Sequence, residues 1–298
     1  MWQKPWTMTE GFLIGGGLIV AGLMLELSIG PVVWDAFQWP VNGIVLALFL
    51  AMLVALHLLR GAVYAFRFLS TYRAAIPALV YAVVLTIIMG LTRQTVSGQW
   101  INNMLTFWPF VLIYLYLTVI LGLDILGRAE RLVTRGKKFG TSQLLPLTSH
   151  LGLFIAIVCG TLGNADMQRL KMITVIDEPE WRAMDQQGNI VELPLAIELK
   201  HFIMEEYDDG SPRRFASDLQ ILTKSGKNLL ATVDVNKPVE VEGWKIYQYG
   251  YDTQMGAMSR TSILELVSDP WLPAVYAGIY LMLIGAFLMF ILSQRRKS

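Results

Sequence analysis

Residues 148–164 read TSHLGLFIAIVCGTLGN, an apolar run with a histidine near its start and small residues spaced along it. A helix that crosses the hydrocarbon core of a membrane needs about 20 mostly apolar residues, so the run indicates a membrane helix. An ionisable side chain at the end of such a helix usually has a partner, a ligand or a proton to handle. The chain has only three histidines, which makes the position of His150 the first indication of function.

The composition favours a membrane protein. Of the 298 residues, 54% are hydrophobic and only 16% are charged, which is unusual for a soluble globular domain. The formal net charge of +1 predicts no general attraction for nucleic acid or for acidic substrates. The single cysteine, Cys159, excludes an intrachain disulfide, a CxxC thiol pair and a covalent CxxCH haem site within this chain.

Six apolar runs are long enough to span a membrane, and we expect the first to be a retained span rather than a cleaved signal peptide. They cover roughly residues 11–30, 41–59, 74–92, 105–127, 147–164 and 270–293. Basic residues gather in alternate connections, namely at Lys4, then at Arg60, Arg67 and Arg73, then at Arg128, Arg131, Arg135, Lys137 and Lys138, and finally at Arg295, Arg296 and Lys297. Because cytoplasmic loops carry an excess of Lys and Arg, we expect a multi-pass protein of the inner (cytoplasmic) membrane, in contact with lipid, with both termini cytoplasmic.

The long connection between the last two spans has a different pattern and is expected on the outer or periplasmic side. Strand signals stand at 193–199, at 215–236 around a Lys-Ser-Gly-Lys turn, at 239–252 and at 261–267, with an Asp-Asp-Gly turn at 208–210. Several short strands separated by turn signals predict a small sandwich or barrel-like domain.

The predicted fold is therefore an α-helical membrane protein of six transmembrane helices with an extracytoplasmic all-β domain between helices five and six. We expect a five-helix membrane region at 1–164, the β-domain at 165–269, and the last helix with a basic cytoplasmic tail at 270–298.

The fifth predicted helix has two distinct faces. Gly152, Ala156 and Gly160 recur every four residues, which is the spacing that lets two helix backbones approach closely. His150 points about 160° away from this seam, on a face that includes Phe154 and Ile157. An imidazole above an apolar, aromatic-containing wall suits a haem, whose iron often takes histidine as an axial ligand. His150 is thus a candidate ligand of haem iron, and Phe154 and Ile157 are a candidate haem-facing wall.

Other interpretations of the histidines remain open. His150 could instead face lipid headgroups or bond a loop carbonyl. The predicted topology places His57, in LVALHLLRG, at a similar depth to His150, so the two could clamp a b-type haem within this chain. His57 could equally turn toward the interface beside Arg60. Asp124 stands four residues before Arg128, a spacing typical of an ion pair within one helix.

The outer segment resembles the ResB family, also called CcsB, of system II cytochrome c maturation. The family pattern of a charged Tyr-Asp-Gly run, then Val-Asn-x-Pro, then Gly-Trp-x-Ile-Tyr-Gln before a tyrosine is present at Tyr207 to Gly210, Val235, Asn236, Pro238, Gly243, Trp244, Ile246, Tyr247, Gln248 and Tyr251. The preceding helix begins His-x-Gly in the family, as His150 and Gly152 do here, and MGLTRQ at 89–94 also fits. The likeness covers roughly residues 75–298.

This resemblance implies a subunit that works with a ResC (CcsA)-type membrane partner in haem export and in haem attachment to apocytochrome c. It implies that haem b, transported or transiently bound, has His150 as one axial ligand and a partner histidine as the other. The tryptophan-rich segment that presents haem belongs to the partner, whereas the nine tryptophans of this chain are dispersed. This chain would then be a non-catalytic subunit of a holocytochrome c synthase (haem lyase) complex.

The first two spans, at 1–60, form an extension before the ResB-like helices at 74–164, so His57 inherits no role from the family. Two further functional interpretations stand beside the first. One is a self-contained b-type cytochrome subunit that uses His57 and His150, and the other is a membrane-anchored ligand-sensing or assembly protein. The lack of motifs for a second electron carrier weighs against the former, and the placement of His150 weighs against the latter.

Overall fold

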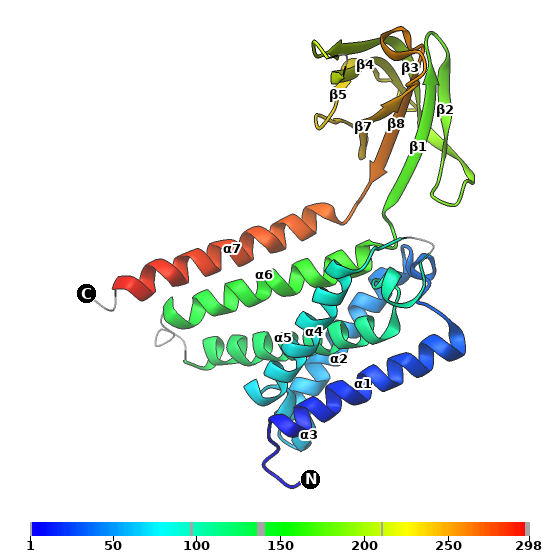
Figure 1. Ribbon diagram of the computed structural model, residues 1–298. Coiled ribbons are helices and arrows are strands. Elements are labelled where there is room, and N and C mark those ends of the chain that lie inside the picture. Colours follow the sequence, from blue (N-terminus) through cyan, green and yellow to red (C-terminus); the bar gives the residue numbers. More distant parts are fainter. Residues whose placement is uncertain (1, 96–97, 136–140, 210, 296–298) are drawn as a thin grey trace. The chain divides into compact units, whose positions relative to one another are not determined.

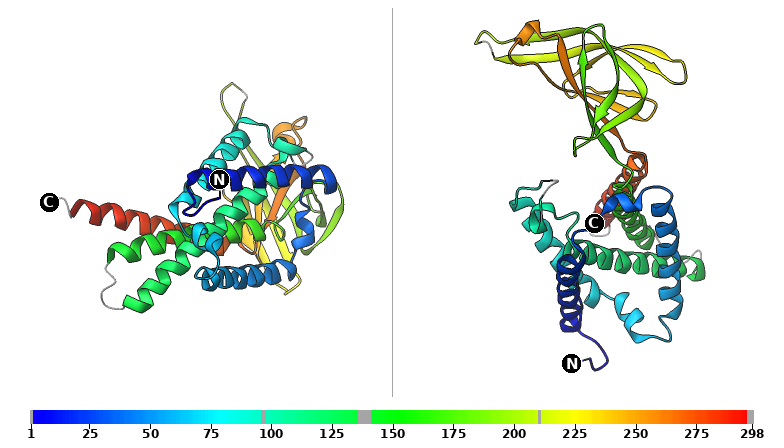
Figure 2. Two further views of the ribbon diagram at one scale, coloured as in Figure 1. Left: turned by 90° about the horizontal axis from the view of Figure 1, so that it is seen from below. Right: turned by 90° about the vertical axis from the view of Figure 1, so that its right-hand side faces the viewer.

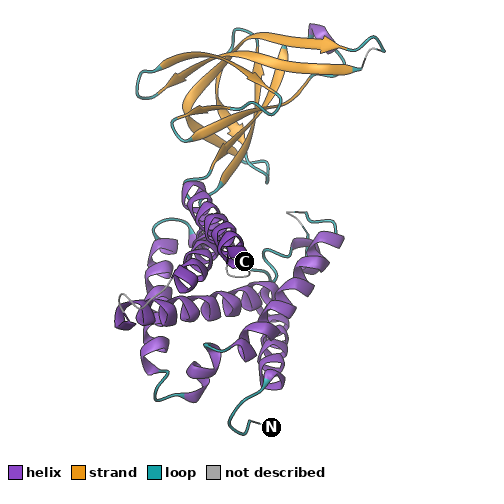
Figure 3. Ribbon diagram, turned by 90° about the vertical axis from the view of Figure 1, so that its left-hand side faces the viewer, coloured by secondary structure: helices purple, strands orange, loops and turns teal. Residues whose placement is uncertain are grey.

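The computed structural model describes residues 2–95, 98–135, 141–209 and 211–295. The chain forms two compact units, and Figure 3 shows that one is built of helices and the other of strands. The helical unit comprises the chain up to Asp166 and from Trp271 onward, and the strand unit comprises Met167–Pro270. The residues Lys137, Lys138, Gly210, Arg296 and Lys297, used above for topology and resemblance, lie outside the described residues.

Six helices of the helical unit are long and apolar enough to cross a membrane. The helices are α1 (Met8–Ile29), α2 (Val41–Leu59), α3 (Tyr64–Leu69), α4 (Tyr72–Leu91), α5 (Trp108–Arg135), α6 (Thr141–Gly163) and α7 (Leu272–Arg295). All but the short α3 correspond to a predicted span. The fourth span continues past residue 127, where the prediction ended, and the helix that holds the fifth begins six residues earlier than predicted.

Helix α5 packs against α1, α2, α4 and α6. It is the most buried of the six spans, with Ile113 and Leu123 almost fully enclosed. Its first backbone N–H, at Trp108, donates to the Glu26 side chain at 3.2 Å, which gives an acceptor to one of the N–H groups that have no partner within the helix. The location of α5 among four helices makes its polar residues available to several neighbours.

Helices α6 and α7 run side by side, as Figure 1 and Figure 2 show. A Cβ added at Gly152 would meet the backbone N of Met282 at 2.3 Å, and one at Gly278 would meet the backbone N of Ala156 at 2.6 Å. One at Gly285 would meet the backbone N of Ser149 at 2.7 Å. Glycines of both helices therefore let the backbones touch. This confirms the predicted close contact of the seam at Gly152 and Ala156 but not at Gly160, where a Cβ would meet only Val275 Cγ2, at 3.9 Å.

Asp166, just after α6, joins three segments of the helical unit. Its carboxylate accepts hydrogen bonds from the backbone N–H of Trp39 at 2.7 Å, from Asn42 Nδ2 at 2.7 Å and from Trp271 Nε1 at 2.6 Å. Partial burial alone would raise the pKa of Asp166, but the three donors together hold that pKa below its usual range. The Asp166 junction thus ties the start of α2 and the residue before α7 to the end of α6.

The strand unit is one antiparallel sheet of eight strands in the order β5-β4-β3-β2-β1-β8-β7-β6. The strands are β1 (Gln168–Val175), β2 (Pro179–Met184), β3 (Ile190–Glu206), β4 (Pro212–Thr223), β5 (Asn228–Asp234), β6 (Val239–Val241), β7 (Trp244–Tyr251) and β8 (Thr261–Ser268). The sheet curls until β5 contacts β6 and β7, and Ser217 of β4 bonds Ser262 of β8 at 2.8 Å. The result is barrel-like, which is one of the two forms, sandwich or barrel, that the sequence predicted.

The apolar residues of the alternating pattern predicted at 193–199 point into this barrel. Leu193, Leu195, Ile197 and Leu199 of β3 are all buried in its core. The stretch at 239–252 was predicted as one alternating segment, but it is two strands joined at Glu242 and Gly243, both with positive φ. β1 and β2 were not predicted, although Leu170 and Met172 alternate with exposed residues in β1.

Candidate functional site

His150 lies on α6 and binds a carboxylate of the neighbouring helix α5. Its Nδ1 is 2.7 Å from Asp124 Oδ2, and Arg128 Nε donates to the same oxygen at 2.6 Å. The side chains of these three residues, the His150 cluster, are partly exposed, with fractions of 37% for His150, 28% for Asp124 and 27% for Arg128. The ion pair between Asp124 and Arg128 confirms the prediction from their spacing.

The carboxylate determines which nitrogen of His150 can bind something else. When Nδ1–H donates to Asp124, the lone pair of the neutral ring is on Nε2. Histidines that ligate metals usually hold their second ring nitrogen in this way, because the carboxylate fixes the tautomer and the ring orientation and increases ligand basicity. The His150 cluster thus fits a single axial ligand of a haem iron, His150 Nε2. Arg128 balances the charge of the carboxylate that holds the ring.

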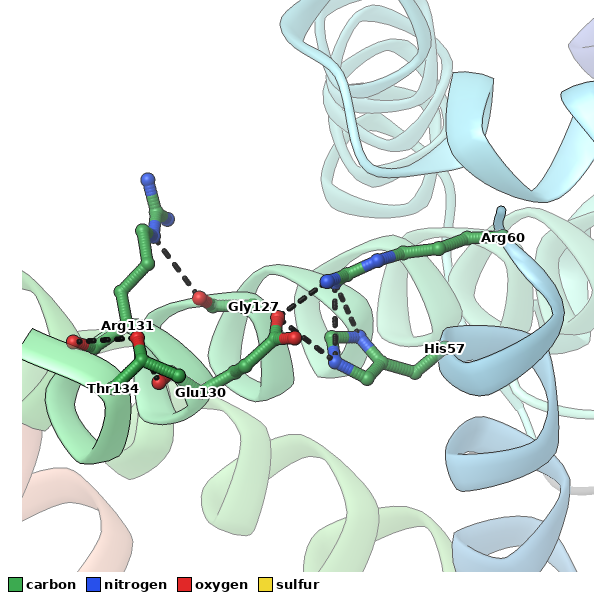
Figure 4. Close-up of polar contacts among 6 residues, drawn as sticks. All are labelled: His57, Arg60, Gly127, Glu130, Arg131 and Thr134. Carbon is green, nitrogen blue, oxygen red and sulfur yellow. Dashed lines mark hydrogen bonds and ion pairs between the residues drawn. The ribbon is translucent and has the colours of Figure 1, made fainter.

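His57, near the end of α2, lies in a second ionic group that Figure 4 shows. Its Nδ1 and Nε2 are 2.9 and 3.1 Å from one guanidinium nitrogen of Arg60, and Nε2 is 3.5 Å from Glu130 Oε2 on α5. Arg60 also donates to Glu130. In this His57 cluster the imidazole side chain is only 11% exposed. Its ring nitrogens contact Arg60 and Glu130.

The two histidines bind different carboxylates of α5. Asp124 and Glu130 are six residues apart, which is about 9 Å along a helix and about 120° around it. Within the described ranges no hydrogen bond or ion pair joins His57 to His150. The third histidine, His201, is in β3 of the strand unit and lies 3.9 Å from Asp218.

The face of α6 below His150 is occupied by the chain's own helices. Phe154 is buried and stacks on Phe49 of α2, with ring centroids 6.2 Å apart. A Cβ at Gly122 of α5 would lie 3.1 Å from the Phe154 ring. Ile157 is half-buried. Phe154 therefore packs into the helical unit, a contact that the helix face alone did not reveal, and contact of Phe154 or Ile157 with haem stays a prediction.

The contact between Asp124 and His150 was missed from the sequence. Residues 26 positions apart on two helices meet only if those helices lie side by side with a suitable rotation. The signal that could have found the pair is the shared depth of an acid and a histidine near the same ends of consecutive spans, because charged groups inside a membrane usually pair.

Comparisons with known proteins place part of this chain among relatives. A family model described as the ResB-like family matches residues 126–263. A protein named cytochrome c biogenesis protein CcsB from Prochlorococcus marinus subsp. pastoris is 27% identical over 143 residues, which are 48% of this chain and 32% of the relative. The protein of that name from Prochlorococcus marinus strain NATL2A is 26% identical over 106 residues, 36% of this chain and 24% of the relative.

The match thus spans about a third or less of the length of these relatives. Among solved structures, that of the Cytochrome c Heme Lyase CcmF aligns with 96% of this chain and 46% of its own, with 12% identity and a TM-score of 0.40. A likeness of that degree does not establish a common fold.

The segment that the family model matches begins two residues after Asp124 and includes His150, all of α6 and the strand unit as far as β8. Six apolar helices, together with relatives of this kind, indicate a multi-pass membrane protein. The likeness predicted for roughly residues 75–298 is found over 126–263, and the resemblance of this chain to the ResB family is confirmed there.

Proposed function

We propose that this chain is a ResB-like membrane subunit of a system II cytochrome c maturation complex. It holds haem b and helps to pass it to the outer side of the membrane for attachment to apocytochrome c. Support comes from the ResB-like match over 126–263 and from relatives named cytochrome c biogenesis proteins. His150 lies inside the matched segment, whereas His57 lies before it.

The contact between Asp124 and His150 carries the proposal. Asp124 Oδ2 holds His150 Nδ1 at 2.7 Å, which leaves Nε2 as the nitrogen that would bind iron. A low-spin haem takes two axial ligands, and this arrangement supplies one. The resemblance to ResB implies that the second ligand is a histidine of a ResC/CcsA-type membrane partner. Both nitrogens of His57 face Arg60, which supports a ligand from outside this chain.

The other parts of the chain have supporting roles in this proposal. Asp124 orients the imidazole, Arg128 balances the carboxylate, and the contact between α6 and α7 fixes the helix that carries His150. The strand unit, on the outer side with both termini cytoplasmic, offers a surface to the partner or to apocytochrome c. The chain is then a non-catalytic subunit, with its ResB-like helices at 74–164 and an N-terminal extension at 1–60.

Haem spectra of the chain purified with and without a ResC/CcsA-type partner test this function. We expect His150→Ala to abolish the haem spectrum of the complex and added imidazole to restore it, since a small ligand can fill the vacated axial position. The matched control His57→Ala should leave the spectrum nearly intact. A partner-free preparation with stoichiometric haem that His57→Ala removes would instead establish a self-contained b-type haem.

A further inference from the structure

A cavity of about 380 Å³ opens at the end of the helical unit where α1 and α4 begin. Its walls come from Trp6 just before α1, from the short helix α3 and from the first residues of α4. The volume falls within the range of about 300–1,000 Å³ that is typical of small-ligand sites. None of its lining residues belongs to the His150 or His57 clusters, and all lie before the segment that resembles ResB.

Two cations, Arg67 and Arg73, line this cavity, and a third, Lys4, lies over the ring of its wall residue Tyr64. Lys4 Nζ lies 5.0 Å and Arg67 Cζ 4.9 Å from the centre of the Tyr64 ring. Arg73 lies 5.8 Å from the Tyr72 ring, and its guanidinium donates to the backbone carbonyl of Trp6 at 3.1 Å. Across the described residues, no ion pair of these three cations with a carboxylate occurs. Their positive charge is therefore available to an anion.

The acid in the first turn of α1, Glu10, is hydrogen-bonded to the start of its own helix. Glu10 is buried, and its Oε2 accepts hydrogen bonds from the backbone N–H and the hydroxyl of Thr7 at 2.8 and 2.7 Å. Within the cavity lining, Thr71 precedes α4 but donates its hydroxyl to the carbonyl of Phe68 at 2.6 Å. Because Thr71 does not cap α4, the first N–H groups of that helix add partial positive charge beside the cations.

The remainder of the lining is aromatic. Trp6 packs edge-on against Tyr64 and Phe68, with ring centroids 5.3 and 5.2 Å apart, and the Trp6 backbone N–H donates to the Tyr64 hydroxyl at 3.0 Å. Tyr72, at the start of α4, is 62% exposed. Since α1 and α4 are two of the apolar spans, this aromatic group lies at a span end, the depth at which Trp and Tyr meet lipid headgroups.

We propose that this cavity binds the phosphate of an anionic phospholipid headgroup. The Arg67 guanidinium, free of carboxylates, presents paired N–H donors that match phosphate oxygens. Lys4 and Arg73 add charge, and Trp6 and Tyr72 contact the apolar part of the lipid next to the phosphate. Basic pockets between spans at the cytoplasmic surface are suited to such headgroups. The opening at span ends makes a membrane lipid, rather than dissolved phosphate, the occupant.

The experiment compares two lipids and three variants of the full chain in neutral detergent. Native mass spectrometry gives the apparent Kd for phosphatidylglycerol and for phosphatidylcholine with the same acyl chains. Arg67→Gln removes an exposed charge with little risk to folding, and Arg67→Lys keeps the charge. Arg131→Gln is the matched control, because Arg131 is exposed near the end of α5 and donates to the carbonyl of Gly127.

We expect the wild type to prefer phosphatidylglycerol and Arg67→Gln to weaken that binding about fivefold, the effect of about 1 kcal/mol per cation at a membrane surface. Arg67→Lys keeps the charge but not the paired N–H donors, so it should recover only part of the affinity, and Arg131→Gln should change nothing. Equal binding of the two lipids, or equal behaviour of Arg67→Gln and Arg131→Gln, would overturn the proposal. Glycerol 3-phosphate or inorganic phosphate should not compete; competition at lipid-equivalent concentration would show that the site takes soluble phosphate and would also overturn it.

Discussion

Asp124 Oδ2 lies 2.7 Å from His150 Nδ1, so a carboxylate of α5 holds the imidazole of α6 by one of its two nitrogens. The same oxygen accepts from Arg128 at 2.6 Å. A histidine fixed in this manner has a defined tautomer and a defined ring plane before any ligand arrives. Removal of the acid therefore tests the proposed ligand without removing the ligand itself.

Asp124→Asn keeps the shape of the side chain and removes its charge. We expect haem affinity of the complex with its partner to fall about tenfold to a hundredfold, as for other carboxylates that orient metal-binding histidines. Haem titration followed by absorbance measures this affinity, and the yield of assembled complex should stay close to that of the wild type. Arg131→Gln, on the same helix, is the control; wild-type affinity in Asp124→Asn would mean that the pair is only a packing contact.

The seam of α6 gives a prediction that needs the structure. A Cβ at Gly152 meets the backbone N of Met282 at 2.3 Å, whereas a Cβ at Gly160 meets only Val275 Cγ2, at 3.9 Å. We expect Gly152→Ala to destabilise the contact of α6 with α7 by about 1–3 kcal/mol, because backbone cannot move aside easily. Gly160→Ala should be near neutral. Thermal unfolding in detergent compares the two, and equal melting temperatures would contradict the close approach at Gly152.

Periodicity predicted the two faces of α6 but not their partners. Spacing alone put Gly152 and Gly160 on one seam, and could not show that α7 approaches closely only at the first of them. Spacing also put His150 opposite that seam. It predicted only Arg128 as the partner of Asp124 and missed His150. The rotation of α5 against α6, which brings Asp124 to His150, is set by packing over the whole helical unit.

In the strand unit, alternation predicted the buried face of β3, where apolar and polar residues lie on opposite sides of one strand. The hairpin of β6 and β7 was missed although the buried positions shift by one residue, from Val241 to Trp244, where Glu242 and Gly243 turn the chain. Two-residue turns of this kind need positive φ, for which Gly243 was the signal.

The side of the membrane that the strand unit occupies can be tested with introduced cysteines, because the chain has a single cysteine, Cys159. In a Cys159→Ser background, Lys224→Cys places a thiol at the exposed turn between β4 and β5, and Gly61→Cys places one at the exposed end of α2. We expect an impermeant maleimide to label Lys224→Cys in intact cells and Gly61→Cys only after permeabilisation. The reverse pattern would invert the predicted orientation.

The Asp166 junction predicts how stability depends on pH. Hydrogen bonds from Trp39, Asn42 and Trp271 hold the folded-state pKa of Asp166 below its usual range, so the ionised carboxylate stabilises the folded chain above the pKa of the unfolded carboxyl, about 3.9. This contribution is lost as the pH falls through the depressed folded-state pKa. Asp166→Asn should therefore melt below the wild type at neutral pH, and the gap in melting temperature should shrink below about pH 4.

Trp271→Phe removes one donor to Asp166 while keeping an aromatic ring beside Gly163, so it should show a smaller gap with the same pH trend. A gap that stays constant from neutral to acid pH would mean that Asp166 acts through shape rather than through its charge.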